Sequence, residues 1–263
     1  MGSEAMKEAA EFIGNNLRLK TFPVAVKFLK DATEFPEKTR QPSVALGKRI
    51  AICQAVTMAR VYGSIIGLTK DDLICVPGSI AFGFSQSNDS AESLSRLFCG
   101  GNYSKDEDAG LQEASSITRF EKGEYGAIVV APLHRAPFDP DTIVLYGNPA
   151  QMMRAIQAWT YLKGIRVHGF FGGKVECSEY LISPFKKQEP RVAIPGMGDR
   201  VFSMTQDEEM VFAIPGRSLS EFIEGLKVAG NKVGAMYPVP VYLNFEPQFP
   251  TFFTKLGQEL GIL

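Results

Sequence analysis

Histidines and cysteines are scarce in this 263-residue chain. There are two histidines and four cysteines, and no two cysteines form a Cys-x-x-Cys pair. The strong signatures of zinc ribbons, thioredoxin-like proteins and ferredoxins are therefore absent. The sequence also lacks a Walker loop, a Gly-x-Ser-x-Gly elbow and a His-Glu-x-x-His helix. No single motif indicates a reaction.

Long apolar runs and an excess of charge of one sign are also missing. The longest apolar runs, such as 127–132, fall far short of the roughly 20 residues that span a membrane. The N-terminus lacks the basic and apolar regions of a secretory signal. The formal net charge is −1, and the one basic cluster (Lys186, Lys187 and Arg191) is interpreted as a solvated loop. We expect a cytoplasmic protein with reduced thiols and neither nucleic acid nor membrane as a partner. The oligomeric state is left open.

The composition is otherwise that of an ordinary globular protein. Hydrophobic residues make up 45% of the chain and charged residues 22%, and no low-complexity stretch or flexible linker divides it. We therefore expect one domain over residues 1–263. In the first half, apolar spacing predicts a helix over 3–17, a strand over 23–29 and a long helix over 43–62. Helix-start signals at Thr69 and Ser104 predict two further helices.

The second half repeats one order of elements. A strand over 127–130, a loop, a strand over 142–146 and a helix form one β-loop-β-helix unit at about 122–164, and the same order recurs at about 190–230. We interpret the two units as a candidate duplication and expect the first two strands to pair. The predicted fold class is α+β, a mixed sheet with helices packed on it after a helical N-terminal part. The junction of the two units would form a cleft for a small molecule.

Three of the four cysteines stand at predicted element boundaries. Cys75 precedes Val-Pro-Gly, Cys99 precedes two glycines, and Cys177 opens a predicted helix after a glycine-rich stretch. At such boundaries backbone N–H groups can approach thiolate sulfurs and offset their charge. A helix N-terminus would also lower the pKa of the Cys177 thiol. Cys53 stands among apolar helix residues, as a buried thiol would.

Three interpretations of these thiols stay open on the residues alone. They are unrelated buried thiols, a metal or iron–sulfur site shared by several of them, and a single reactive thiol. Because only His134 and His168 are available as nitrogen ligands, an iron–sulfur cluster is favoured over zinc. His134 lies in a predicted loop and His168 in a predicted strand, and a thiol–histidine catalytic pair is permitted without being indicated.

Three further residues are candidates for binding a small polar ligand. Asp199 and Arg200 follow Pro195-Gly-x-Gly in a predicted tight loop, where the guanidinium of Arg200 could clamp a carboxylate or phosphate. The two side chains could instead brace each other in a turn. Gln151 lies in the first turn of a predicted helix, where it could face the cleft or complete the helix cap.

The order of the motifs along the chain carries a resemblance over roughly residues 10–235. The motifs are Cys53-Gln54, Asp72-Leu-x-Cys75-x-x-Gly78, Ala131-Pro-Leu133, Pro140-Asp141, Gly147-Asn-Pro-Ala-Gln151, Cys177-Ser178 and Pro195-Gly-x-Gly-Asp-Arg200. This order resembles a family of archaeal and bacterial proteins known as a domain of unknown function, number 169 in that series. The resemblance implies no activity. It places Cys53, Cys75 and Cys177 in family-like motifs and leaves Cys99 outside them, which favours a three-thiolate site.

The leading hypothesis is an iron–sulfur or other thiolate-held metal centre bound by Cys53, Cys75 and Cys177. A site for a small molecule would lie beside it. The alternative is a metal-free binding or sensing module that holds a small anionic ligand in the cleft, and a cysteine-nucleophile enzyme is the third hypothesis. The leading hypothesis requires folding to bring the three sulfur atoms together in one place.

Overall fold

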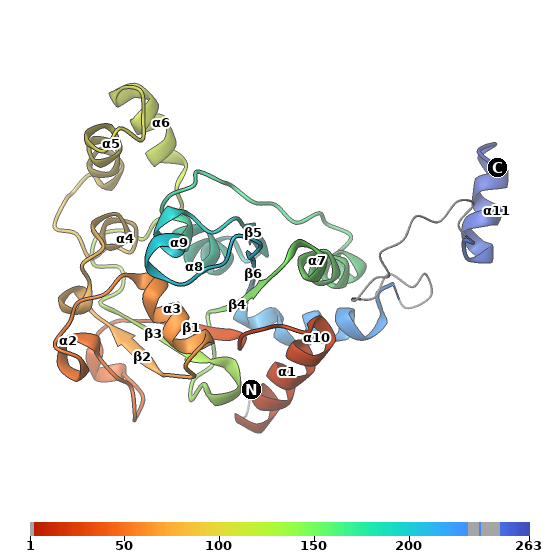
Figure 1. Cartoon of the computed structure of the whole chain (residues 1–263), viewed down its shortest axis with the longest axis horizontal. Coiled ribbons are helices and arrows are strands. Elements are labelled where there is room, and N and C mark those ends of the chain that lie inside the picture. Colours follow the sequence, from red (N-terminus) through yellow and green to blue (C-terminus); the bar gives the residue numbers. More distant parts are fainter. Residues whose placement is uncertain (1–2, 231–236, 238–247) are drawn as a thin grey trace.

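The computed structural model describes residues 3–230, 237 and 248–263, and its centre is a six-stranded sheet (Figure 1). The strands lie in the order β2-β3-β1-β4-β6-β5. They are β1 (Val24–Leu29), β2 (Ile66–Leu68), β3 (Ala127–Pro132), β4 (Thr142–Gly147), β5 (Arg191–Ala193) and β6 (Met210–Pro215). The predicted α+β class is confirmed. The mixed sheet is wrong, because all neighbouring strands of this sheet pair antiparallel.

The antiparallel sheet results from the position of β1. This strand lies between β3 and β4, with Val26 opposite Val130 and Val24 opposite Val144. The expected pairing of β3 with β4 is therefore wrong, since each pairs with β1 instead. In the second unit β5 and β6 pair directly, so the two units differ in strand adjacency. Their origin by duplication stays a hypothesis.

Helices lie on both faces of the sheet and around it (Figure 1). They are α1 (Ser3–Leu17), α2 (Pro42–Ala45), α3 (Ile52–Arg60), α4 (Val76–Ala81), α5 (Ser90–Gly100), α6 (Glu107–Ser116), α7 (Pro149–Lys163), α8 (Glu176–Lys187), α9 (Met197–Phe202), α10 (Leu219–Val228) and α11 (Thr251–Glu259). Short 3-10 turns are η1 (Ala32–Glu34), η2 (Lys70–Asp72), η3 (Leu133–Arg135) and η4 (Gly216–Ser218).

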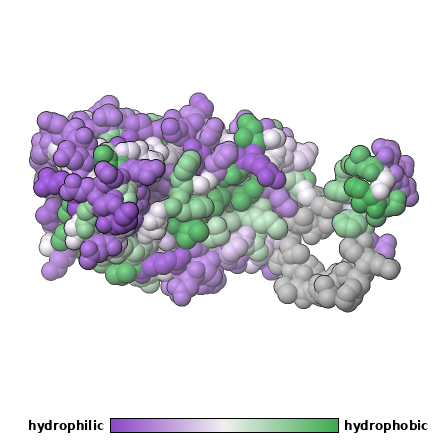
Figure 2. Space-filling model, turned by 90° about the horizontal axis from the view of Figure 1, so that it is seen from above, coloured by the Kyte–Doolittle hydropathy of each residue, from purple (hydrophilic) through white to green (hydrophobic). Residues whose placement is uncertain are grey.

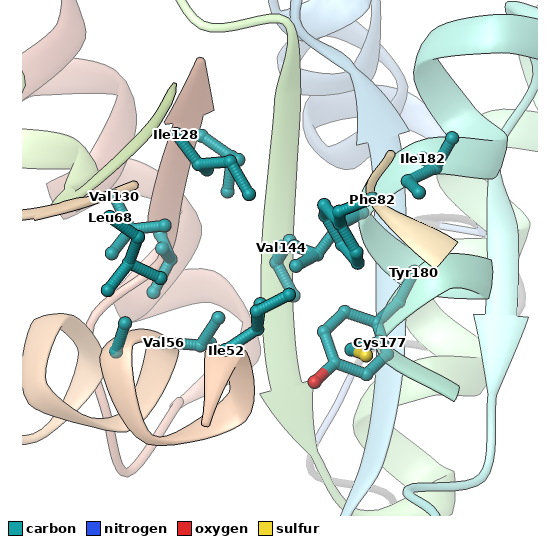
Figure 3. Packing of buried hydrophobic residues seen from close by; sticks show 14 of the residues in the cluster. Ile52, Val56, Leu68, Phe82, Ile128, Val130, Val144, Cys177, Tyr180 and Ile182 are labelled. Atoms are coloured by element: carbon teal, nitrogen blue, oxygen red, sulfur yellow. The ribbon is translucent and has the colours of Figure 1, made fainter. Parts of the chain in front are cut away.

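The strands alternate between two apolar cores, as expected of a sheet that is covered on both sides. In β4, Val144 and Tyr146 point to the core shared with α3 and α8, and Ile143 and Leu145 point to the core shared with α1, α7 and α10. Figure 3 shows the first core, in which the labelled Ile52 of α3 and Tyr180 of α8 approach Val144. Packing on one face of the sheet or the other therefore sets the positions of α1, α3, α7, α8 and α10.

The long helix predicted over 43–62 is wrong. The chain leaves α2 after Ala45, takes a left-handed turn at Gly47 with φ +60°, and begins α3 only at Ile52. Between the two helices the Ile50 N–H donates to Asp72 O (2.8 Å), and the Ile50 carbonyl accepts from the Ile74 N–H (3.1 Å). These two hydrogen bonds to the segment before α4 hold the chain around Ile50 out of a helix, although its apolar spacing is helical. As a result, Cys53 lies in the first turn of a helix.

The two helix-start signals had different outcomes. Thr69 and Asp72 form the expected capping box, but the helix they open is only the 3-10 turn η2. Cys75 therefore belongs to the next helix, α4, as its N-cap residue. The second signal is displaced, because Asp106 rather than Ser104 caps α6.

The C-terminal helix α11 has an unburied apolar side. None of its nine residues is buried, and Figures 1 and 2 show it beside the rest of the molecule with hydrophobic and hydrophilic residues on different sides. Its exposed apolar residues include Phe252, Phe253, Leu256 and Leu260. Within the described ranges, no helix is both long enough and apolar enough to cross a membrane.

The buried guanidinium of Arg154 yields a stability prediction. Arg154 on α7 is 2% exposed and donates to Ala229 O (2.6 Å) and Leu226 O (2.5 Å), the carbonyl groups at the end of α10. Arg154→Met would leave these buried carbonyls without their donor. We expect a loss of about 2–4 kcal/mol in the free energy of unfolding, measured by urea denaturation.

A matched control lies between the same two helices. Lys163 of α7 pairs with Glu221 of α10 at 2.8 Å, and both side chains are more than a third exposed. Lys163→Met is expected to cost less than about 1 kcal/mol. Equal effects of the two substitutions would contradict the importance of the buried guanidinium.

Candidate functional site

The candidate site is built from the first turns of four helices. Cys53 is the second residue of α3, Cys75 is the N-cap of α4 and Cys177 is the second residue of α8. Asp199 is the third residue of α9. Two of these helices, α3 with nine residues and α8 with 12, are long enough for their N-termini to favour negative charge. We call this group of three thiols and one carboxyl the thiol cluster.

The members of the thiol cluster lie close enough for their charges to interact. The pKa of Cys53 is raised to about 12, first by burial and then by the negative charges of Asp199 and Cys75. The pKa of Cys177 is well above its usual value, first because of burial and then because of Cys75, Asp199 and Cys53. Each thiol thus interacts with the other two. The three cysteines thus lie in one region of the fold, and their convergence on a single point stays a prediction.

Burial keeps these thiols protonated. Cys53 and Cys177 are only 7% and 8% exposed, while Cys75 is half-buried. The pKa of Cys75 is also raised by burial, and the backbone N–H of Gly78 opposes this rise. Figure 3 shows the sulfur of Cys177 beside the ring of Tyr180, within the apolar core. Deprotonation therefore requires a positively charged partner.

Asp199 connects α9 to α8. It is 3% exposed, and its Oδ1 accepts from the hydroxyl of Tyr180 at 2.6 Å. Its Oδ2 accepts from the backbone N–H of Gly196 at 3.1 Å. Burial raises the pKa of Asp199, and the bond from Tyr180 opposes this rise. With both oxygens engaged, Asp199 fixes the start of α9 beside the thiols.

Two glycines allow the helix starts to approach each other. A Cβ atom on Gly78 would lie 3.2 Å from the sulfur of Cys75 and 3.3 Å from Cδ1 of Ile52. A Cβ atom on Gly196 would lie 3.0 Å from Cγ of Glu176. A side chain at either position would therefore press α4 away from α3, or α9 away from α8.

Two buried hydroxyl groups beside the cluster have unused hydrogen-bonding capacity. Ser203 is 2% exposed and Thr205 is 6% exposed, and neither hydroxyl has a hydrogen-bond partner of standard geometry among the residues that the structure describes. The Ser203 hydroxyl is close enough to Cys53 to lower the pKa of its thiol. The Ser203 hydroxyl thus neighbours the Cys53 thiol, and Thr205 lies beside Asp199, whose carbonyl oxygen accepts from the Thr205 N–H at 3.4 Å.

A buried ion pair supplies positive charge near the cluster. Arg60 and Glu209 form two hydrogen bonds, of 2.7 Å and 3.1 Å, and are 2% and 7% exposed. The Arg60 guanidinium also lies over the ring of Tyr146, 4.0 Å from its centroid. Its charge lowers the pKa of Asp199. The ion pair thus partly offsets negative charge on the cluster.

The other small-molecule candidates do not join Asp199. Arg200 points away from the core and donates to Gln206 O at 2.7 Å. Gln151 lies on α7, on the opposite face of the sheet, where its Oε1 accepts from Asn148 N (2.7 Å) and its Nε2 donates to Leu17 O (2.8 Å). Gln151 thus completes the cap of α7 and binds the end of α1. Asp199 and Arg200 do not brace each other either.

The remaining thiol and the histidines occupy other places. Cys99 lies at the contact of α5 with α6, where a Cβ atom on Gly110 would be 3.2 Å from its sulfur. The ring of His134 lies 4.5 Å from that of Phe22, and burial lowers the pKa of His134. His168 bridges to Arg191 at the edge of the sheet. No local signal pointed to the parts that were missed, namely Tyr180, Ser203 and the Arg60–Glu209 pair, because each depends on tertiary contacts.

The side chains of the thiol cluster do not have the arrangement of a metal site. Within the described residues, no three histidine, cysteine, aspartate or glutamate side chains are positioned to hold a metal ion as they stand. Rotation of a cysteine side chain between staggered positions moves its sulfur by roughly 3 Å. The three thiols therefore share one region of the fold without forming a metal site as they stand.

Comparison with known proteins assigns the chain to a family. Residues 13–225 match the model of DUF169, described as "Uncharacterised ArCR". An uncharacterised protein of the archaeon Methanocaldococcus jannaschii is 30% identical over 206 residues, which is 78% of this chain and 86% of the relative. The chain belongs to the DUF169 family, and the resemblance noted in its motifs is confirmed. No solved structure matches it.

Glu176, next to Cys177, yields a pH prediction. Its Oε1 accepts from the N–H groups of Gly172 (2.6 Å) and Gly173 (2.8 Å), yet burial raises its pKa from 4.5 to about 7. The folded state therefore holds this proton more tightly than the unfolded state. The resulting stabilisation is complete below about pH 4.5 and is lost as the pH rises to about 7.

Glu176→Gln replaces the titrating carboxyl group with an amide group of the same shape, which does not titrate. We expect the wild type to lose on the order of 3 kcal/mol of unfolding free energy relative to the variant between pH 4.5 and pH 7.5. Urea denaturation at several pH values measures the difference. The exposed Glu8→Gln on α1 is the control. Parallel pH curves for the wild type and Glu176→Gln would refute the raised pKa.

Proposed function

We propose that Cys53, Cys75 and Cys177 bind a thiophilic metal centre, either an iron–sulfur cluster or a single ion such as Fe²⁺ or Zn²⁺. The observation that carries this proposal is the mutual interaction of three thiols that fold together from distant parts of the chain. Thiolates select these metals over the hard cations Mg²⁺ and Ca²⁺. Because both oxygens of Asp199 already accept hydrogen bonds, three thiolates are the protein ligands and a further position is open.

Charge balance supports a metal over an activated nucleophile. Burial raises the pKa of all three thiols, whereas a cysteine nucleophile needs a lowered pKa. A metal cation compensates for three adjacent thiolates, and the N-termini of α3 and α8 add positive potential. The hydroxyl of Ser203 beside Cys53 can donate to a metal-bound thiolate. When bound, such a centre supplies Lewis-acid or redox chemistry.

The first test is metal content. We expect protein purified without oxygen to contain iron or zinc, with broad absorption near 400 nm if the centre is an iron–sulfur cluster. Each of Cys53→Ser, Cys75→Ser and Cys177→Ser should lower the bound metal by at least about tenfold, measured by inductively coupled plasma mass spectrometry. Cys99→Ser is the matched control and should retain the metal.

The design separates loss of the site from loss of the fold. Far-UV circular dichroism of each variant shows whether it is folded, and Cys177→Ala replaces Cys177→Ser if a buried hydroxyl unfolds the protein. Folded variants of all three cysteines that keep their full metal content would refute the proposal. A wild type that contains no metal and takes up neither Zn²⁺ nor reconstituted iron would refute it as well.

The second test is proton release. Because the free thiols are protonated, binding of one ion to three thiolates releases up to three protons. The apparent affinity of metal-free protein for Zn²⁺ should therefore rise with pH, by up to about three decades per pH unit between pH 6.5 and 8. Competition with a chromophoric chelator under reducing conditions measures it. Each single serine variant should lower the slope by about one, and a slope near zero in the wild type would contradict a thiolate site.

A further inference from the structure

A second candidate site lies on the far side of the molecule from the start of α8. A cavity of about 550 Å³ opens between the end of α7, the beginning of β5 and the start of α10, where the first and second β-loop-β-helix units meet. We call it the basic cleft. Its lining residues are Trp159, Lys163, Ile165, Arg166, His168, Lys187, Gln188, Glu189, Pro190, Arg191, Arg217, Ser218 and Glu221.

Positive charge exceeds negative charge in the basic cleft. Five lysines and arginines line it, against two glutamates. Glu221 pairs with Lys163 at 2.8 Å, and Glu189 pairs with Arg191 at 3.2 Å. The other three cations, Arg166, Lys187 and Arg217, form no ion pair within the part of the chain that the structure describes. The charge of Lys187 does act on Glu179, whose pKa it lowers. This excess stands out on a chain whose formal net charge is −1.

Helix ends explain only part of this excess. Lys163 and Lys187 lie in the last turns of α7 and α8, where a cation also offsets the helix dipole. Arg166 lies in the loop after α7, and Arg217 lies in η4, just before α10. Neither arginine has such a role. Their guanidinium groups face one cavity without a counter-ion from the described residues, although like charges repel each other.

The remaining walls suit an organic anion. Ser218, the N-cap of α10, makes no side-chain cap hydrogen bond in the described structure, so the start of a ten-residue helix adds positive potential at the cleft. Trp159, Ile165 and Pro190 supply apolar surface beside the charges. The volume is that of a small-molecule site.

We propose that the basic cleft binds a small organic phosphate. Guanidinium groups bind phosphate oxygens through paired N–H donors, which Arg166 and Arg217 supply from two sides of the cavity. The apolar wall contacts the organic part of the ligand. The ligand chemistry differs from that of the thiol cluster, and the two sites lie at opposite ends of α8, which is about 18 Å long by its 12 residues. This proposal does not rest on metal binding.

The chain contains a built-in reporter for this site. Trp159 lines the cleft and is the single tryptophan of the sequence, so its fluorescence reports binding there. The test titrates the full-length protein with inorganic pyrophosphate, fructose 1,6-bisphosphate and ADP, and with citrate as an anion without phosphate. We expect a saturable fluorescence change with at least one of the organic phosphates at submillimolar concentration, weakened by added salt.

Paired charge variants decide the assignment. The double variant Arg166→Gln/Arg217→Gln should weaken phosphate binding at least about tenfold, since each lost charged hydrogen bond costs 1.5 kcal/mol or more. The control Lys48→Gln/Arg49→Gln removes the same charge from exposed positions before α3 and should change the affinity less than twofold.

Three outcomes would overturn the proposal. They are the absence of a saturable change with any organic phosphate, binding of citrate or pyrophosphate alone, and equal weakening by the two double variants. Far-UV circular dichroism confirms that the variants are folded. Metal content, measured on the same samples, is expected to stay unchanged, which keeps this test separate from that of the thiol cluster.

Discussion

Helix α8 has no solvent-exposed face over most of its length, and this enclosure organises the elements around it. Nine consecutive residues, 176–184, are buried, so the helix is enclosed by the sheet on one side and by other helices around it. Its polar side chains must then find partners inside the protein. Glu179 pairs with Arg191 at 3.1 Å, Tyr180 donates to Asp199, and Glu176 accepts from the glycines before the helix. These contacts place α9 and β5 as well as α8.

The same enclosure determines how readily the thiols of the site ionise. Cys177 enters the core at the positive end of α8, and the enclosing elements bring Cys53 and Cys75 next to it. Burial opposes ionisation of all three thiols, while the helix N-termini favour it. Desolvation dominates in the protein alone. A cation at the cluster would reverse this balance, because it interacts with three thiolates at once in a medium that screens charge poorly.

Local signals in the sequence predicted local structure well. Asn148 and Pro149 predicted the start of α7, and short apolar runs predicted β3 and β4, because caps and strand-length apolar runs depend on neighbouring residues. Long-range pairing was not predictable in the same way. No local signal places β1 between β3 and β4, or ties Ile50 to the segment before α4. The convergence of the thiols was expected from the boundaries at which they stand and from the family-like motifs, and it stays a prediction. The separation of Asp199 from Arg200 followed from α9, since adjacent helix residues point in different directions.

The polarity of α8 relates the two candidate sites. The positive end of its dipole faces the thiol cluster, where negative charge would develop, and its negative end carries Lys186 and Lys187 toward the surface. A cation at the C-terminus is favoured by the helix itself, so Lys187 can remain without an ion pair at modest cost. Arg166 and Arg217 receive no such compensation from a helix end. The basic cleft is thus a surface where positive charge has been placed beyond what the fold requires, and an anionic ligand is the simplest group that offsets it.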